Sequence, residues 1–111
     1  MSNSGNSFKN EEIREIAATS ITTSYANLGS PISHRAYRIT IMNDTNGDVY
    51  IRRSTDPAGV DTRRIAAQQG RILDDKTNDA VEGNGVQYTI KWAGSAPGAP
   101  AGTFWVEVEY V

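Results

Sequence analysis

The sequence predicts an all-β protein, an antiparallel β-sandwich or jelly roll of about seven or eight strands with a flexible N-terminal arm. Three observations lead to this prediction. First, apolar and polar residues alternate in several segments with the period of two that places one side of a strand in a core. Second, glycine, proline, asparagine and aspartate separate these segments at near-regular intervals, as in sandwiches and jelly rolls. Third, 111 residues, of which 38% are hydrophobic, suit one domain with one core.

The N-terminal segment is expected to remain outside the core. Residues 1–12 form the predicted arm, and residues 13–111 form the predicted β-sandwich domain. Ser2 to Asn10 is small and polar, with Phe8 as its only large apolar residue. Such a segment cannot bury enough apolar surface to offset the entropy lost on ordering, so we expect it to be mobile unless a partner orders it.

A short helix is predicted over Asn10 to Ala17, at the junction between the arm and the domain. Ile13 and Ile16 have helical spacing, Asn10 is a suitable cap, and two glutamates follow it. Acidic residues in the first turn interact favourably with the helix dipole. At two turns, such a helix is only marginally stable by itself.

The middle of the chain contains a predicted β-hairpin. The segment ITTSYANL, after Ser20, suits a strand, and Arg35 to Met42 alternates apolar and polar residues. The Asn46-Gly47 pair tolerates the positive φ angles of a tight hairpin turn. We therefore predict that RITIM and VYIRR, on either side of this turn, pair with each other.

The second half of the chain supplies the remaining strands. Two short strands are predicted within Arg63 to Leu73, and Asp74 to Gly85 reads as a loop. Val86 to Trp92 and Thr103 to Val111 both alternate, and the Gly/Pro/Ala-rich residues 94–102 connect them at the surface. The residues predicted to lie between the two sheets are Ile39, Ile41, Ile90, Trp92, Val106 and Val108.

Composition argues against several classes of function. A net charge of −2 disfavours a nucleic-acid partner, and a chain without cysteine has neither disulfides nor a thiolate nucleophile. No apolar run has the length of a membrane span or the form of a signal peptide, so we expect a soluble protein made in the cytosol. His34, the single histidine, follows Ser33, and neighbours in an extended chain point to opposite faces. We therefore predict no enzyme activity, no cofactor, no metal and no small-molecule substrate.

Arginine is the informative residue type, because seven of the eight arginines lie between Arg35 and Arg71. Pairs of arginines could grip phosphates, could form a protein interface, or could simply make ordinary cross-strand ion pairs. The overall acidity favours a protein interface over phosphate binding. With Phe8 of the arm, the candidate partner-binding residues are Arg52, Arg53, Arg63, Arg64 and Arg71.

The order of motifs in the last three quarters of the chain resembles a family of phage proteins. An Asn-rich turn follows RITIM, and Asp74 or Asp75 with Asn78 supplies an Asp-x-x-x-Asn loop. A Gly/Pro/Ala connection then leads into a closing strand of the pattern G-x-x-x-V-E-x-x-Y, from Gly102 to Tyr110. This order resembles the capsid decoration (stapling or cement) proteins of epsilon-fifteen-like Salmonella podoviruses.

The resemblance implies a jelly-roll structural protein on the outer capsid surface of a bacteriophage virion, made in the cytoplasm of the bacterial host. Its implied partners are an HK97-like major capsid protein and a second copy of itself in a homodimer. The family offers no catalytic residues to carry over. The alternative is a carbohydrate-binding or tail-adsorption sandwich, for which only Trp105 alternates outward as a stacking platform, whereas Trp92 shares the core face with Tyr88 and Ile90.

Overall fold

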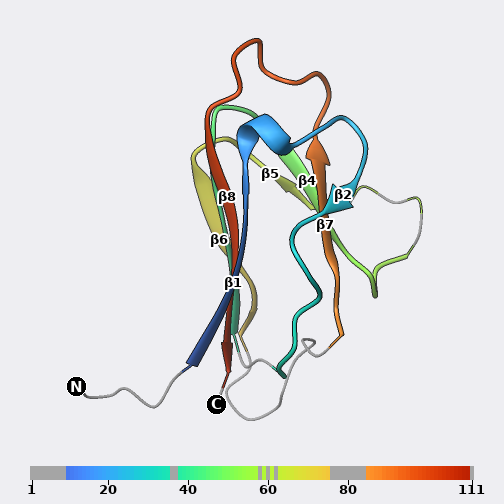
Figure 1. The fold of residues 1–111 in the computed structure, drawn as a ribbon, viewed down its shortest axis with the longest axis vertical. Helices are drawn as coiled ribbons and strands as arrows, with labels where there is room; N and C mark the ends of the chain where they lie inside the picture. The colour runs from blue at the N-terminus through green and yellow to red at the C-terminus, as the bar shows by residue number, and fades with distance from the viewer. Residues whose placement is uncertain are drawn as a thin grey trace, which may run out of the picture.

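The computed structural model describes residues 10–35, 38–57, 59, 61, 63–75 and 85–110. In this part of the chain, eight β-strands and one 3-10 helix form two four-stranded sheets that face each other (Figure 1). Sheet A has the order β1-β8-β3-β6, and sheet B has the order β2-β7-β4-β5. The elements are β1 (Asn10–Ala17), η1 (Ala18–Ser20), β2 (Ala26–Asn27), β3 (Arg38–Thr45), β4 (Val49–Arg53), β5 (Arg64–Ile65), β6 (Gln69–Asp75), β7 (Tyr88–Trp92) and β8 (Gly102–Tyr110).

The strand pairs are nested within one another. The first strand pairs with the last, β2 with β7, β3 with β6, and β4 with β5, all antiparallel. Additional pairs, β3 with β8 and β4 with β7, complete the two sheets. This is the strand arrangement of an eight-stranded jelly roll. The predicted fold class is therefore confirmed.

The core lies between the two sheets. All six residues predicted to be buried are at most 1% exposed, and Tyr88 and Phe104 are equally buried beside them. The indole Nε1 of Trp92 donates a hydrogen bond to the Ile21 carbonyl at 3.0 Å, so the largest core side chain keeps its polar atom satisfied. Alternation alone was sufficient to identify this inner face, because each core strand has one buried side.

The predicted helix over Asn10 to Ala17 is wrong, because this segment is strand β1. All eight of its residues are in register with β8, from Asn10 opposite Tyr110 to Ala17 opposite Thr103. A two-turn helix is marginal in water, whereas pairing along a whole strand satisfies the backbone through the sheet. Asn10 to Glu12, assigned to the arm from the sequence, thus belong to sheet A, and residues 1–9 lie outside the described residues.

The predicted hairpin at Asn46-Gly47 is also wrong, because β3 belongs to sheet A and β4 to sheet B. The two residues form a corner that takes the chain from one sheet to the other. A tight hairpin turn would need positive φ angles, and neither residue has one. Glycine is required at position 47 by space instead, since a Cβ there would lie 2.8 Å from Pro97 and 3.0 Å from the Trp92 ring.

A buried polar network holds this corner. Asn43 is fully buried, and its Nδ2 donates to the carbonyls of Gly47 at 2.9 Å and Ile65 at 3.0 Å. Its Oδ1 accepts from the backbone N–H of Thr45 at 3.0 Å and from the Thr45 hydroxyl at 2.6 Å. One amide thus bonds to the end of β3, to the corner itself and to the end of β5, in place of hairpin hydrogen bonds.

Other strands differ from the sequence prediction at their ends. The strand expected over ITTSYANL is reduced to Ala26–Asn27, and the strand expected from Arg35 begins at Arg38 and extends to Thr45. Asp74 and Asp75, expected in a loop, end β6. Gly102 starts β8 with a φ of +93°, and a Cβ there would lie 2.0 Å from the Asp44 carbonyl, so only glycine fits.

Candidate docking surfaces

The outer face of sheet A carries an apolar patch. By alternation and register, Ile13, Trp105, Met42 and Ile72 all point away from the core, one from each strand of the sheet. These four are the large hydrophobic side chains that the structure shows to be exposed, by 36% to 53%. Scattered exposed apolar residues are ordinary, but a contiguous group on one sheet face is typical of an interaction surface.

The register arranges this face in two rows that run across the four strands. In the first row, Glu107 lies between Ile13 and Thr40, and Thr40 lies opposite Ile72. In the second row, Trp105 lies between Glu15 and Met42. The second row ends at Gly70, which lies opposite Met42. A Cβ at Gly70 would lie 3.0 Å from the Met42 methyl group, so the Met42 side chain covers the position where the row has no side chain of its own.

A groove of about 310 Å³ opens at the β1 end of these rows, lined by Ile13, Glu15, Trp105 and Glu107. The Trp105 indole Nε1 donates a 2.9 Å hydrogen bond to Glu15 Oε2, which fixes the ring along the groove. The site thus combines an aromatic surface with two carboxylates. Its volume is at the small end of the range for ligand pockets.

The outer face of sheet A is strongly acidic. Register places Glu11, Glu15, Glu107, Glu109 and Asp44 on it. The one basic residue described on this face is Arg38, whose guanidinium lies 4.0 Å from the Glu109 carboxylate. The face therefore has a large excess of negative charge around its apolar patch.

The outer face of sheet B is built from cations and tyrosines. Arg52 and Lys91 lie over the Tyr25 ring at 4.9 Å and 4.7 Å, and Arg64 and Lys91 lie over the Tyr50 ring at 5.9 Å and 5.7 Å. Cations over aromatic rings are attracted to the π electrons. The chain's own cations therefore already lie over both tyrosine rings.

Acidic residues of the same chain neutralise much of this face. Asp61 accepts from the Tyr25 hydroxyl at 2.7 Å and from Lys91 Nζ at 3.1 Å, and Asp48 accepts from Arg64 at 3.0 Å. Burial and the hydrogen bond to Asp61 raise the pKa of Tyr25 above its usual value, so its hydroxyl remains a donor. The face is held together by its own ion pairs.

Two of the predicted contact residues, Arg53 and Arg63, meet at one carboxylate. Asp56 accepts from the Arg53 backbone N–H at 2.8 Å and from the Arg63 guanidinium, and all three side chains are largely buried. Burial alone would raise the pKa of Asp56, but the hydrogen bonds from Arg63 and Arg53 and their charges keep it below its usual value. These arginines thus hold the turn after β4.

The other predicted contact residues do not form one patch with them. Arg52 and Arg64 lie on the outer face of sheet B, and Arg52 also donates to the Pro57 carbonyl at 3.2 Å. Arg71 is exposed on β6, at the edge of sheet A, opposite Ile41. Phe8 lies outside the described residues.

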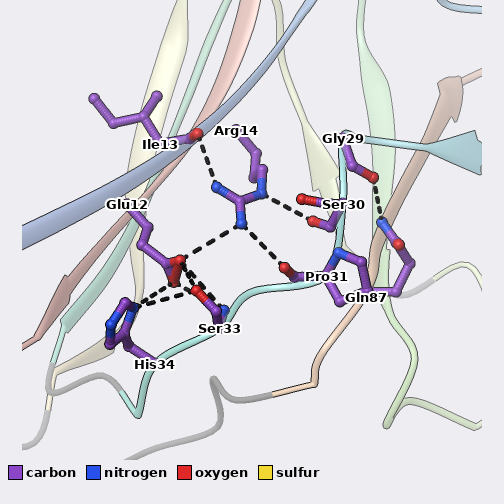
Figure 2. A network of polar contacts seen from close by, with 9 residues as sticks. All are labelled: Glu12, Ile13, Arg14, Gly29, Ser30, Pro31, Ser33, His34 and Gln87. Carbon is purple, nitrogen blue, oxygen red and sulfur yellow. Dashed lines mark hydrogen bonds and ion pairs between the residues drawn. The ribbon is translucent and has the colours of Figure 1, made fainter.

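A polar clamp closes one side of the sandwich (Figure 2). The Arg14 guanidinium, on β1, donates to the carbonyls of Ser30 at 2.9 Å and Pro31 at 3.0 Å. Glu12, two residues earlier on the same strand face, accepts from the Ser33 backbone N–H at 2.9 Å and from the Ser33 hydroxyl. This pair ties the segment after β2 to the edge of sheet A.

Ser33 and His34 do come into contact, contrary to the expectation that they point apart. The backbone bends at His34, so Ser33 Oγ lies 3.3 Å from His34 Nδ1, and the His34 ring stacks on Tyr110 at 3.7 Å. Glu12 Oε1 also lies 3.3 Å from Nδ1. A Ser-His-acid triad needs serine and acid on different ring nitrogens. Here both share one, and the serine bonds directly to the acid, so the cluster is built as a clamp.

Within the described ranges, no group of three or more histidine, aspartate or glutamate side chains is arranged to hold a metal ion. No helix in that part of the chain is long and apolar enough to cross a bilayer.

Sequence reasoning missed the patch on sheet A, apart from Trp105. Ile13 was predicted to lie in a helix. Met42 and Ile72 were predicted to lie in strands, but no role was assigned to their outward side chains. A usable signal exists, because Ile41-Met42, Ile72-Leu73 and Phe104-Trp105-Val106 each put apolar residues next to one another in a strand. Adjacent apolar residues in a strand face opposite sides, so one of them must leave the core of a two-layer sandwich.

No protein-family model matches this chain, and no curated protein or solved structure is significantly similar to it.

Proposed function

We propose that this protein is a non-catalytic virion protein that binds the outer surface of an icosahedral phage capsid and staples neighbouring major capsid subunits. The motif order of the last three quarters of the sequence supports the assignment to a capsid. The gathering of Ile13, Met42, Ile72 and Trp105 on the outer face of sheet A supports a docking role, and it is the observation on which the proposal rests most.

The proposed mechanism is thermodynamic linkage. A protein that binds only the closed shell stabilises that shell by mass action, and many copies add their effects. A rigid sandwich suits this task, since a preformed surface loses little conformational entropy on docking. The proposed partners are the HK97-like major capsid protein and a second copy in a homodimer, with the virion surface as the location.

Co-sedimentation tests the proposal. Purified protein is expected to sediment with assembled shells of the phage that encodes it and to stay in solution with unassembled capsid subunits. Equal retention by subunits and shells, or by neither, would contradict the stapling role.

A double substitution then tests the surface. Met42→Ser with Ile72→Ser removes apolar area from the outer face of sheet A and is expected to lower shell affinity at least about tenfold, equivalent to about 1.4 kcal/mol. Arg52, Arg64 and Arg71 are the arginines of the sequence-predicted contact set that lie at the surface. Unchanged affinity in the double variant would transfer the docking role to them.

A second candidate, carbohydrate binding, is favoured by the groove in which Trp105 is flanked by Glu15 and Glu107. Aromatic rings stack on sugars, and carboxylates accept hydrogen bonds from hydroxyl groups. Oligosaccharide fragments of the host surface polysaccharide would then shift the NMR signal of the Trp105 indole N–H. The same fragments should leave the buried Trp92 signal in place.

A further inference from the structure

We infer that the groove between β1 and β8 receives an arginine side chain from the partner protein, whose surface is basic around an apolar centre. This inference deepens the proposed function and rests on it, because it states the chemistry of the surface that the outer face of sheet A contacts. Four residues and the charge of the whole face carry it.

The four lining residues form a square of two cross-strand pairs. Ile13 lies opposite Glu107, and Glu15 lies opposite Trp105. The two carboxylates therefore occupy one diagonal, and the two apolar side chains occupy the other. A planar, charged group that enters the groove meets an aromatic or aliphatic wall and a carboxylate on each side.

An arginine side chain fits this combination better than other groups. Its guanidinium stacks on aromatic rings, most favourably on tryptophan, and its N–H groups match carboxylate oxygens in a fixed geometry. Its aliphatic stem can lie on Ile13. The hydrogen bond from Trp105 Nε1 to Glu15 Oε2 orients the ring in advance, and a carboxylate can accept further donors while it holds that bond.

The surroundings of the groove extend the complementarity. Five acidic residues and one base lie on the outer face of sheet A, so a partner surface with arginine or lysine around its apolar contacts is favoured over an acidic one. The basic face of a second copy is a poorer match, because Arg64 and Lys91 are already paired with Asp48 and Asp61.

A peptide titration tests the inference. The probes are the capped pentapeptide Arg-Gly-Leu-Gly-Arg and a matched peptide in which citrulline replaces both arginines, which keeps the shape and removes the charge. The readout is the NMR signal of the Trp105 indole N–H, assigned with Trp105→Phe, while the Trp92 signal reports that the core is intact. We expect the arginine peptide to shift the Trp105 signal in a saturable way and the citrulline peptide to bind at least threefold more weakly.

Two charge-removing variants separate the groove from the general field of the face. Glu107→Gln is expected to weaken binding of the arginine peptide about three- to fivefold, the range of an exposed ion pair. Glu11→Gln removes the same charge from the same face outside the groove and is expected to weaken binding less than twofold. Equal losses in both variants would overturn a specific site.

Other outcomes are equally decisive. Equal binding of the two peptides, or no shift of the Trp105 signal with either, would overturn the inference. A Trp105 shift that depends on protein concentration alone, with a dimer mass in light scattering, would make a second copy the occupant and would also overturn it. Shell co-sedimentation without a peptide response refutes the arginine site alone, whereas a peptide response without shell binding refutes the capsid assignment alone.

Discussion

The two outer faces of the sandwich differ in the sign of their charges and in the side chains that surround those charges. On sheet B, the cations are held by Asp48 and Asp61 of the same chain and by the Tyr25 and Tyr50 rings. On sheet A, acidic residues outnumber Arg38 and surround an exposed apolar patch. A segment rich in charge is therefore a weaker sign of a docking surface than a sheet face on which large apolar side chains are exposed among charges of mostly one sign.

The largest expected effect is a loss of folding stability that distinguishes a core residue from a residue of the apolar patch on sheet A. Ile90→Ala is expected to lower the free energy of unfolding by about 2 to 5 kcal/mol, because it leaves a cavity between the sheets. Ile72→Ala, on the outer face of sheet A, should change it by about 0.5 kcal/mol or less. Denaturant melts measure both values. Similar losses in the two variants would mean that the outer patch serves folding.

The next effect concerns the corner that joins the two sheets. Asn43→Ala removes the donors to the Gly47 and Ile65 carbonyls and is expected to cost about 1 to 3 kcal/mol. Asn46→Ala, at the exposed side of the same corner, removes a bond pair to Ala99 and Ala101 and serves as the matched control with a smaller loss. A neutral Asn43→Ala would show that water replaces the amide.

Charge reversal on the outer face of sheet B tests whether that face contributes to shell binding. The double variant Arg52→Glu with Arg64→Glu is expected to change shell affinity by less than about twofold, whereas Glu107→Arg should weaken it about fivefold or more. Co-sedimentation at fixed salt concentration measures both. Loss of shell binding in the sheet B variant alone would reverse the roles assigned to the two faces.

The smallest effect is a pH dependence of stability from Asp56, the carboxylate that contacts Arg53 and Arg63 in the turn after β4. The pKa of Asp56 is lowered in the folded state, so its stabilisation is complete above its unfolded pKa near 4 and is lost as pH falls through the folded value. Asp56→Asn should therefore lose less stability than the parent protein between pH 5 and pH 3. Parallel stability curves for the two proteins would contradict this assignment.

The sequence was sufficient to predict the fold class and the core. A two-residue period is a local property, and alternate apolar residues mark the inner faces of β3 at Ile39 and Ile41, of β7 from Tyr88 to Trp92 and of β8 from Phe104 to Val108. It was not sufficient to predict which strands pair. Asn46-Gly47 has the residues of a hairpin turn, yet the chain crosses to the other sheet there. The Asn43 side chain donates hydrogen bonds to the Gly47 and Ile65 carbonyls, and the Trp92 ring packs against Gly47.

The candidate surface was harder to predict than the core for a related reason. The arginine pairs are conspicuous in the sequence, but the folded chain decides their partners, such as Asp56 for Arg63 and Asp48 for Arg64. The patch on sheet A collects one residue from each of four strands that are far apart in the sequence. Such a site exists only after the register of the whole sheet is fixed.

The nested strand pairs have a consequence for how the protein folds during synthesis. Of the described strands, β8 is the last to leave the ribosome, and it lies between β1 and β3 in the finished sheet A. Until it arrives, β1 has no partner, and β3 lacks one of its two neighbours. Folding dominated by such non-local pairings is slow, with relaxation in the range of milliseconds to seconds. Sheet A, and with it the patch that spans its outer face, can therefore form only after β8 has been synthesised, so a nascent chain cannot present that patch before this strand is in place.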